Sequence, residues 1–147
     1  MIAIPAFQYI HLDGITYHVL RVPDDIRALL THWIKAEWHH DQAPDQPWTD
    51  EWLARLDNST FKLSIVPMSS IIPRADLMRY ETTDYSFGQS LKRRADERQE
   101  AILRGVSIEP LLVDANGMEL MDGYTRYTVL QRFGISECYA YVGTRPA

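Results

Sequence analysis

The chain has 147 residues, 46% hydrophobic and 24% charged, which is the length and composition of one ordinary folded domain and excludes a disordered protein. No apolar run approaches the ~18 residues of a membrane span, and the amino terminus lacks the basic start and long apolar stretch of a secretory signal. The net charge of −5 weighs against DNA binding without excluding it, because non-specific affinity for nucleic acid comes from excess Lys and Arg. We therefore expect a cytoplasmic protein with no membrane partner.

The amino-terminal part of the chain differs in composition from the rest. Residues 1–58 hold all four tryptophans, all five histidines and nine acidic residues against four basic ones, whereas residues 59–147 hold eleven of each charge. We therefore predict two parts: a Trp- and His-rich extension, residues 1–58, and a second domain, residues 59–147. The tryptophans suit a small aromatic core or a docking surface for a protein partner.

A hairpin and two helices are predicted within the extension. Apolar runs at 7–10 and 15–22 flank an Asp-Gly pair, which is a strong tight-turn signal. Apolar residues then recur at helical spacing from residue 26 to about Trp38. The polar, proline-containing stretch that follows predicts a loop, and a short helix is expected at 49–56.

Imidazole and carboxylate groups also gather late in the first helix. Such groups suit zinc or iron. Their spacing matches no defensible ligand motif, and adjacent histidines point in different directions on a regular element, so we predict a solvated helix end and no metal site. The residues concerned are His32, Glu37, His39, His40 and Asp41.

The pattern after residue 58 predicts a mixed α and β domain. The alternating run FKLSIV predicts a strand ended by Pro67, and 69–85 should be mostly loop. The stretch 90–104 predicts a helix whose interspersed charges favour a solvated face over a nucleic-acid patch, with Leu91, Ala95, Ile102 and Leu103 toward a core.

The carboxyl-terminal third predicts a second hairpin, a helix and a final strand. The hairpin strands are 111–113 and 118–121, the helix is 124–133 and the strand is 138–142. Strand, loop, helix, hairpin, helix and strand in this order indicate an α+β fold. The single cysteine, Cys138, falls in the last strand and is read as a buried structural thiol.

The junction between the second hairpin and its helix carries the sharpest chemical signal, in the run DGYTRYTVLQRF from Asp122. Gly123 allows a tight turn, and the first helical turn presents unpaired N–H groups and the positive end of the helix dipole, which suit an anion. Thr125 adds a hydroxyl donor, and Arg126 adds a fork of N–H groups that fits two oxygens of one phosphate. Asp122 could cap the helix or take a functional role.

With this turn, residues 61–143 resemble the ParB/sulfiredoxin superfamily, whose members share an apolar strand, a turn of the form acidic-or-Gly-Gly-x-x-Arg and a helix ending near a glycine. Upstream, 66–74 resembles the family's first box with VPMSSIIPR, and 104–113 resembles its glycine and Pro-apolar-apolar-Val strand with RGVSIEPLLV. The resemblance implies a ParB/sulfiredoxin-like α+β fold. It also implies that Gly123, Tyr124, Thr125 and Arg126 bind a nucleotide phosphate.

Departures from the family pattern narrow the expected activity. Sulfiredoxins carry a catalytic cysteine directly after the turn glycine, where this chain has Tyr124, so sulfinic-acid reduction is not expected. Partition-type ParB proteins carry Glu-Arg-Arg there and continue into a helix-turn-helix, whereas this chain has Tyr-Thr-Arg and ends at Ala147. Centromere binding is therefore not expected either.

The turn is most similar to that of a third branch, the ParB-like free-serine kinases, which carry Asp-Gly-His-His-Arg. Asp122, Gly123 and Arg126 match that pattern, while Tyr124 and Thr125 replace the two histidines. The aspartate and arginine roles therefore carry over, and the histidine roles do not.

The same branch places an acidic general base in the loop after the first strand. Asp76 lies nearest to that place and Glu81 is the alternative, although the residues alone favour an exposed loop carboxylate for either. The resemblance implies ATP, ADP or CTP with Mg²⁺ as cofactor, and phosphoryl transfer to a small hydroxylated molecule or nucleotide hydrolysis as activity. The alternative is a non-catalytic nucleotide-sensing or protein/DNA-interaction module.

Overall fold

The computed structural model describes residues 6–40, 48–74 and 87–146, with side chains at 35–40 and 87–90 left aside. The extension begins with strands β1 (Gln8–Leu12) and β2 (Ile15–Val19), which form an antiparallel hairpin. Helix α1 (Pro23–His40) and helix α2 (Asp50–Asp57) follow. The predicted hairpin and both predicted helices of the extension are thereby confirmed.

The described residues of the second part form a five-stranded mixed sheet and two α-helices, α4 and α5. Its strands lie in the order β3-β7-β5-β6-β4, with β3–β7 and β5–β6 antiparallel and β5–β7 and β4–β6 parallel. The elements, in chain order, are β3 (Thr60–Pro67), a 3-10 turn (Met68–Ser70), β4 (Ile72–Pro73), α4 (Phe87–Leu103), β5 (Leu111–Asp114), β6 (Glu119–Asp122), α5 (Tyr124–Arg132) and β7 (Glu137–Thr144).

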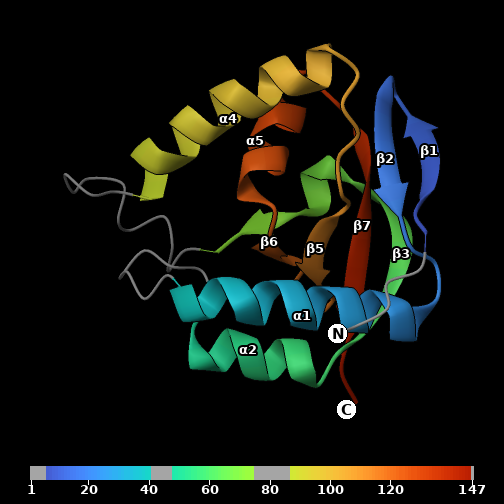
Figure 1. Cartoon of the computed structure of the whole chain (residues 1–147), viewed down its shortest axis with the longest axis vertical. Coiled ribbons are helices and arrows are strands. Elements are labelled where there is room, and N and C mark those ends of the chain that lie inside the picture. The colour runs from blue at the N-terminus through green and yellow to red at the C-terminus, as the bar shows by residue number, and fades with distance from the viewer. Residues whose placement is uncertain (1–5, 41–47, 75–86, 147) are drawn as a thin grey trace.

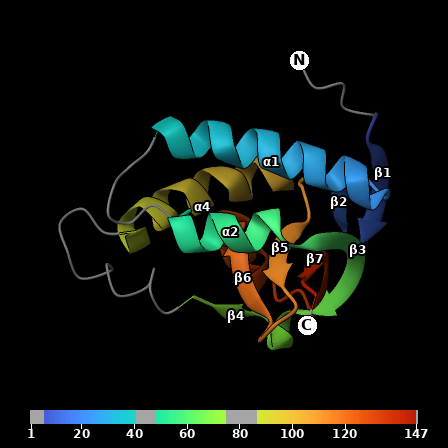
Figure 2. The ribbon, with the colours of Figure 1, turned by 90° about the horizontal axis from the view of Figure 1, so that it is seen from below.

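The helices form one layer on each face of this sheet, as Figures 1 and 2 show: α4 and α5 on one face, α1 and α2 on the other. The strands supply both layers, because successive residues of a strand point to opposite faces. Leu111 and Val113 join the cluster beneath α4 and α5, whereas Leu112 joins the cluster beneath α1 and α2. The helices of the extension therefore share a hydrophobic core with the sheet.

The tryptophans Trp48 and Trp52 lie in that second cluster, 1% and 5% exposed, against Phe61 and Tyr141 of the sheet. Of the two interpretations of the tryptophan-rich segment, the aromatic core is the one that these two side chains confirm. The fold is α+β, as predicted from the order of elements after residue 60, with the predicted amino-terminal hairpin and helices added to it.

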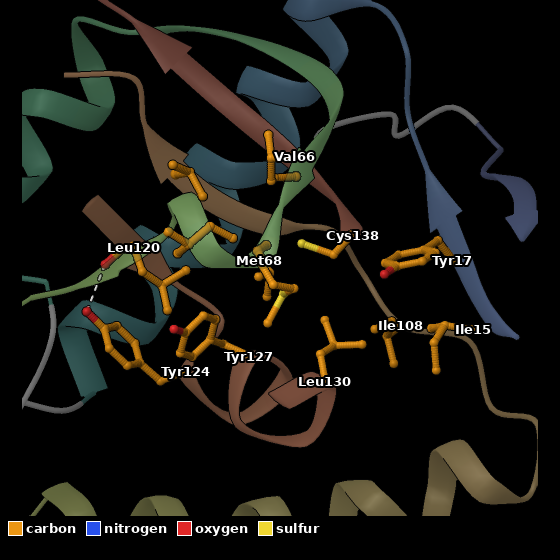
Figure 3. Packing of buried hydrophobic residues seen from close by; sticks show 14 of the residues in the cluster. Ile15, Tyr17, Val66, Met68, Ile108, Leu120, Tyr124, Tyr127, Leu130 and Cys138 are labelled. Carbon is orange, nitrogen blue, oxygen red and sulfur yellow. Dashed lines mark hydrogen bonds between the residues drawn. The ribbon is translucent and has the colours of Figure 1, made fainter. Parts of the chain in front are cut away.

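The β1–β2 hairpin lies outside the sheet but is joined to the segment that precedes β5. The N–H of His18 donates to the Ile108 carbonyl at 3.0 Å, and the N–H of Ile108 donates to the Thr16 carbonyl at 2.9 Å. Ile15 and Tyr17 of β2 pack beside Ile108 in the cluster that Figure 3 shows. The hairpin thus completes the core beneath α4 and α5.

Two local predictions need correction. β4 lies within the stretch 69–85 predicted as mostly loop, because the N–H of Ile72 pairs with the Met118 carbonyl at 2.9 Å, a tertiary contact without a local signal. Leu103 is 70% exposed, since it lies about 100° around the helix from Ile102, which does reach the core.

No helix within the described ranges has the length and hydrophobicity to cross a membrane.

Candidate functional site

The turn at Gly123 places three backbone N–H groups at the amino-terminal end of α5. Gly123 is the N-cap residue of α5, with φ 97° and ψ 28°, and the first helical hydrogen bond runs from Tyr127 N–H to the Gly123 carbonyl at 2.8 Å. The N–H groups of Tyr124, Thr125 and Arg126 therefore precede the helical hydrogen-bond ladder. Gly123, and not Asp122, occupies the N-cap position, while the Asp122 carboxyl accepts from the Gly123 N–H.

Arg126 lies directly behind this turn and is 7% exposed. Its Nη1 donates to Glu109 Oε2 at 3.2 Å, while its Nε is buried with no hydrogen-bond partner among the described residues. A Cβ atom at position 123 would lie 2.6 Å from Nη2 and 3.2 Å from Nε. The guanidinium therefore turns its Nε–Nη2 edge toward Gly123, and only glycine leaves room for it.

Glu109 connects the turn to the amino-terminal hairpin. Its Oε1 lies 3.5 Å from His18 Nε2, and its other oxygen accepts from Arg126. Glu109 and His18 were not predicted as site residues, because their contacts join segments that are far apart in the sequence. The one local signal was the position of Glu109 immediately before the Pro-apolar-apolar-Val strand.

Arginines of α4 add positive charge next to Arg126. Burial lowers the pKa of the half-buried Arg98 below its usual value, the nearby Arg126 charge lowers that pKa further, and Glu109 raises it. The charge of Arg94 acts on Asp122 and lowers its pKa. The charged face of α4 is exposed at Arg94, as predicted, whereas Arg98 is half-buried.

Asp122 ends β6 directly before the turn. Burial raises the pKa of its carboxyl above the ordinary value, and Glu109 adds to that rise, while Arg126, the Gly123 N–H and Arg94 oppose it. The structure thus brings Asp122 together with Gly123, Tyr124, Thr125 and Arg126. An aspartate whose pKa is raised takes up a proton more readily than an exposed one, which suits proton transfer.

The side chain of Tyr124 serves the fold. Its hydroxyl donates to the Leu120 carbonyl at 2.8 Å, as Figure 3 shows, and accepts from the N–H of Arg74 at 2.8 Å. At the start of α5, Tyr124 therefore contributes its backbone N–H and not its hydroxyl. Arg74 is fully buried and its guanidinium lies 3.9 Å from the Trp52 ring centroid, so the VPMSSIIPR box is fixed between α5 and α2.

The two loop carboxylates proposed as general base, Asp76 and Glu81, lie outside the described residues. The described residues before this loop end at Arg74, whose backbone N–H donates to the Tyr124 hydroxyl. Within the described ranges no group of three or more His, Cys, Asp or Glu side chains could hold a metal ion. The side chains of Glu37, His39, His40 and Asp41 are outside those ranges.

The cysteine is expected to be unreactive in the folded protein. Cys138 is fully buried, and burial raises the pKa of its thiol to about 12, so the nucleophilic thiolate is scarce at neutral pH. At pH 8 we expect no reaction with a disulfide reagent such as Ellman's in buffer, and one thiol released per chain in guanidinium chloride. Rapid labelling of the native protein would contradict this assignment.

The sequence and the structure were compared with those of known proteins. No protein-family model and no curated protein matches the sequence. Three of the solved structures that match are ParB N-domains and a sulfiredoxin. They are a Pnob8-like ParB-N domain (TM-score 0.45, 17% identity), a pNOB8-like ParB N-domain (0.42, 22%) and sulfiredoxin from Arabidopsis thaliana (0.36, 21%).

The matches cover 60%, 58% and 54% of this chain, respectively. They cover 32% and 28% of the two ParB chains and 82% of the sulfiredoxin chain, so this chain matches about a third of each ParB structure. The two kinds of protein are those that the sequence resembles. The likeness concerns the fold, and the ligand of this chain is a separate question.

Proposed function

We propose that the chain binds the phosphate groups of a nucleotide at the start of α5. The observation that carries this proposal is the buried Nε of Arg126, which lacks a hydrogen-bond partner among the described residues. This nitrogen faces Gly123, the N-cap residue of α5. A buried N–H without a partner costs free energy, so its position requires an explanation. An anion at the turn is the ligand that helix N–H groups and a guanidinium both favour.

Each charged group near the turn has a role in this proposal. The N–H groups of residues 124–126 donate hydrogen bonds to one phosphate, Arg126 neutralises it, and the α4 arginines supply charge for further phosphates of ATP, ADP or CTP. Asp122 is the described carboxyl beside the turn that would hold Mg²⁺ brought in with the nucleotide, and the metal would supply positive charge against the phosphates.

Phosphoryl transfer is the activity proposed for such a site. The hydroxyl oxygen of a small acceptor forms a bond to the terminal phosphorus as the bond to the bridging oxygen breaks, and the hydroxyl proton passes to a carboxylate. Asp122 lies beside the turn, and Asp76 and Glu81 remain proposed candidates from the sequence. With water as acceptor the same geometry gives hydrolysis.

A second function, nucleotide sensing without turnover, is favoured by the contact between Glu109 and His18. This contact links the turn to the hairpin of the extension. A phosphate that draws Arg126 away from Glu109 would change the hairpin contacts, which could be read by a protein partner. Phosphorus NMR separates the two functions, because transfer and hydrolysis create new phosphate signals and sensing does not.

Replacing Arg126 by alanine should weaken binding of magnesium ATP at least about tenfold, because a charge-assisted hydrogen bond contributes about 1.5–3 kcal/mol. The matched control is Arg132→Ala on the same helix, whose guanidinium pairs with Asp96 at 2.9 Å on the surface. Titration calorimetry with ATP, ADP and CTP measures the affinities, and thermal melts verify folding. Equal affinities for the two folded variants, or no nucleotide bound by the unmodified chain, would refute the proposal.

A further inference from the structure

We propose that His18 is a positioning residue for the candidate site: through Glu109 it sets the orientation of the Arg126 guanidinium. The proposal deepens the proposed function and rests on it, because the guanidinium is taken to bind phosphate. It gives the amino-terminal extension a role in the site, which neither the sequence resemblance nor the fold assigns to it.

The imidazole of His18 is held from three directions. Its Nδ1 shares a hydrogen bond with Ser107 Oγ at 2.9 Å, its Nε2 lies 3.5 Å from Glu109 Oε1, and the ring of Phe7 meets it edge-on with centroids 5.0 Å apart. The His18 side chain is 19% exposed. A ring fixed in this way presents Nε2 to Glu109 in one orientation.

The backbone on both sides of this contact is fixed as well. β2 exchanges two hydrogen bonds with Ile108, the residue before Glu109, and Pro110 follows with its restricted φ. The hairpin therefore fixes the main chain next to Glu109 and also contacts its carboxylate. The Glu109 side chain is 30% exposed, so these contacts are needed to keep it in one rotamer.

The position of Glu109 decides which edge of Arg126 faces the turn. Glu109 engages Nη1, and the guanidinium is planar, so Nε and Nη2 face Gly123 together. This edge can donate two parallel hydrogen bonds to two oxygens of one phosphate. A guanidinium rotated by one position would present a different pair of donors to the turn.

Other charges also act on Glu109. It interacts electrostatically with Arg98 of α4, and Asp122 repels it. It forms ion pairs with His18 and Arg126. Without His18, the carboxylate loses one of these two contacts, and we expect it to leave Arg126 Nη1 more readily.

The test uses the full chain with His18→Ala and the conservative variant His18→Gln, which retains an amide N–H that can reach Glu109. The control is His11→Ala on the same hairpin, an exposed histidine that contacts Thr16 at 2.9 Å. In the ligand-free protein, the Nε–H signal of Arg126 in a ¹⁵N spectrum, assigned by its loss in Arg126→Lys, should shift in His18→Ala. It should stay in place in His11→Ala and return toward its original position in His18→Gln.

Binding provides the second measurement. His18→Ala should weaken binding of inorganic tripolyphosphate and magnesium ATP by about 3- to 10-fold, as expected for coupled neighbours. The same substitution made in a Glu109→Gln background should have no further effect, because the link through the carboxylate is already broken. A merely structural histidine would lower affinity equally in both backgrounds, and thermal melts identify any variant that fails to fold.

The outcomes separate this inference from the proposed function. If the unmodified chain binds neither probe, the proposed function fails, and the Arg126 signal still shows whether His18 orients the guanidinium. If the chain binds both probes, and His18→Ala changes neither that signal nor the affinity, the positioning role is overturned. The same holds if the affinity loss persists in the Glu109→Gln background.

Discussion

Substitution of Gly123 by alanine is expected to reduce the free energy of unfolding by about 2–5 kcal/mol and to displace Arg126 from the turn. A positive φ costs a residue with a Cβ about 1–2 kcal/mol, and overpacking adds about 1–3 kcal/mol. The added Cβ would lie 2.6 Å from Arg126 Nη2 and 3.0 Å from Leu111 Cδ2. The guanidinium cannot simply retreat, because Glu109 holds its other nitrogen.

Gly134→Ala provides a matched control at the opposite end of the same helix. Gly134 has φ +69°, and a Cβ there would meet nothing within 4 Å. The alanine variant should therefore lose only the free energy needed to hold a residue with a Cβ at a positive φ, about 1–2 kcal/mol. Urea titrations give the loss in free energy of unfolding for each variant. The difference between the two losses is the part caused by the close approach of Arg126 to Gly123. Equal losses at the two glycines would mean that Arg126 does not depend on the space above Gly123.

Removal of the Asp114 carboxylate should cost about 2–4 kcal/mol of stability, because it leaves two arginines without their shared partner. Asp114 is 1% exposed at the end of β5; its Oδ2 lies 2.8 Å from Arg145 Nη1 and 3.4 Å from Arg55 Nη1. Its Oδ1 also accepts the N–H of Asn116 at 3.1 Å, which fixes the β5–β6 turn. Both arginines are partly exposed, so solvent reduces the loss below that of a fully buried pair.

The comparison variants for Asp114→Ala are Asp114→Asn and Glu119→Gln. Asp114→Asn keeps the turn hydrogen bond and loses only the charge, so it should retain part of the stability. Glu119 also faces Arg55, at 3.5 Å, but its side chain is 36% exposed, so Glu119→Gln should cost less than about 1 kcal/mol. The denaturant concentrations at the unfolding midpoints give the order of stability of the three variants. A loss at Glu119 as large as that at Asp114 would show that burial does not set the energy of this network.

Local patterns predicted most of the elements, since the Asp-Gly and Asn-Gly turns and the helical spacing of apolar residues act over a few residues. They could not predict the pairing of β4 with β6 or the contact of His18 with Ser107, which spans 89 residues. The turn residues around Gly123 were found because glycine, hydroxyl and guanidinium groups are adjacent in sequence. Glu109 was missed because its partners are brought to it only by the folded chain.

The placement of the extension against the sheet was likewise beyond the sequence. Composition separates residues 1–58 from the rest, yet Trp48, Trp52 and α1 share one cluster with Phe61 and Tyr141. A change in composition along a chain reports on the sequence and carries no information on which faces will be buried together. That division therefore remains a prediction.

The sheet order also bears on how the chain folds during synthesis. β3 lies at an edge of the sheet and, among the described strands, pairs only with β7, the last one. A ribosome releases the chain amino terminus first, so β3 emerges long before its partner and α1 and α2 wait for Tyr141 to complete their cluster. Until β7 has emerged, α1 and α2 lack Tyr141, one of their partners in the sheet, and β3 lacks its described strand partner.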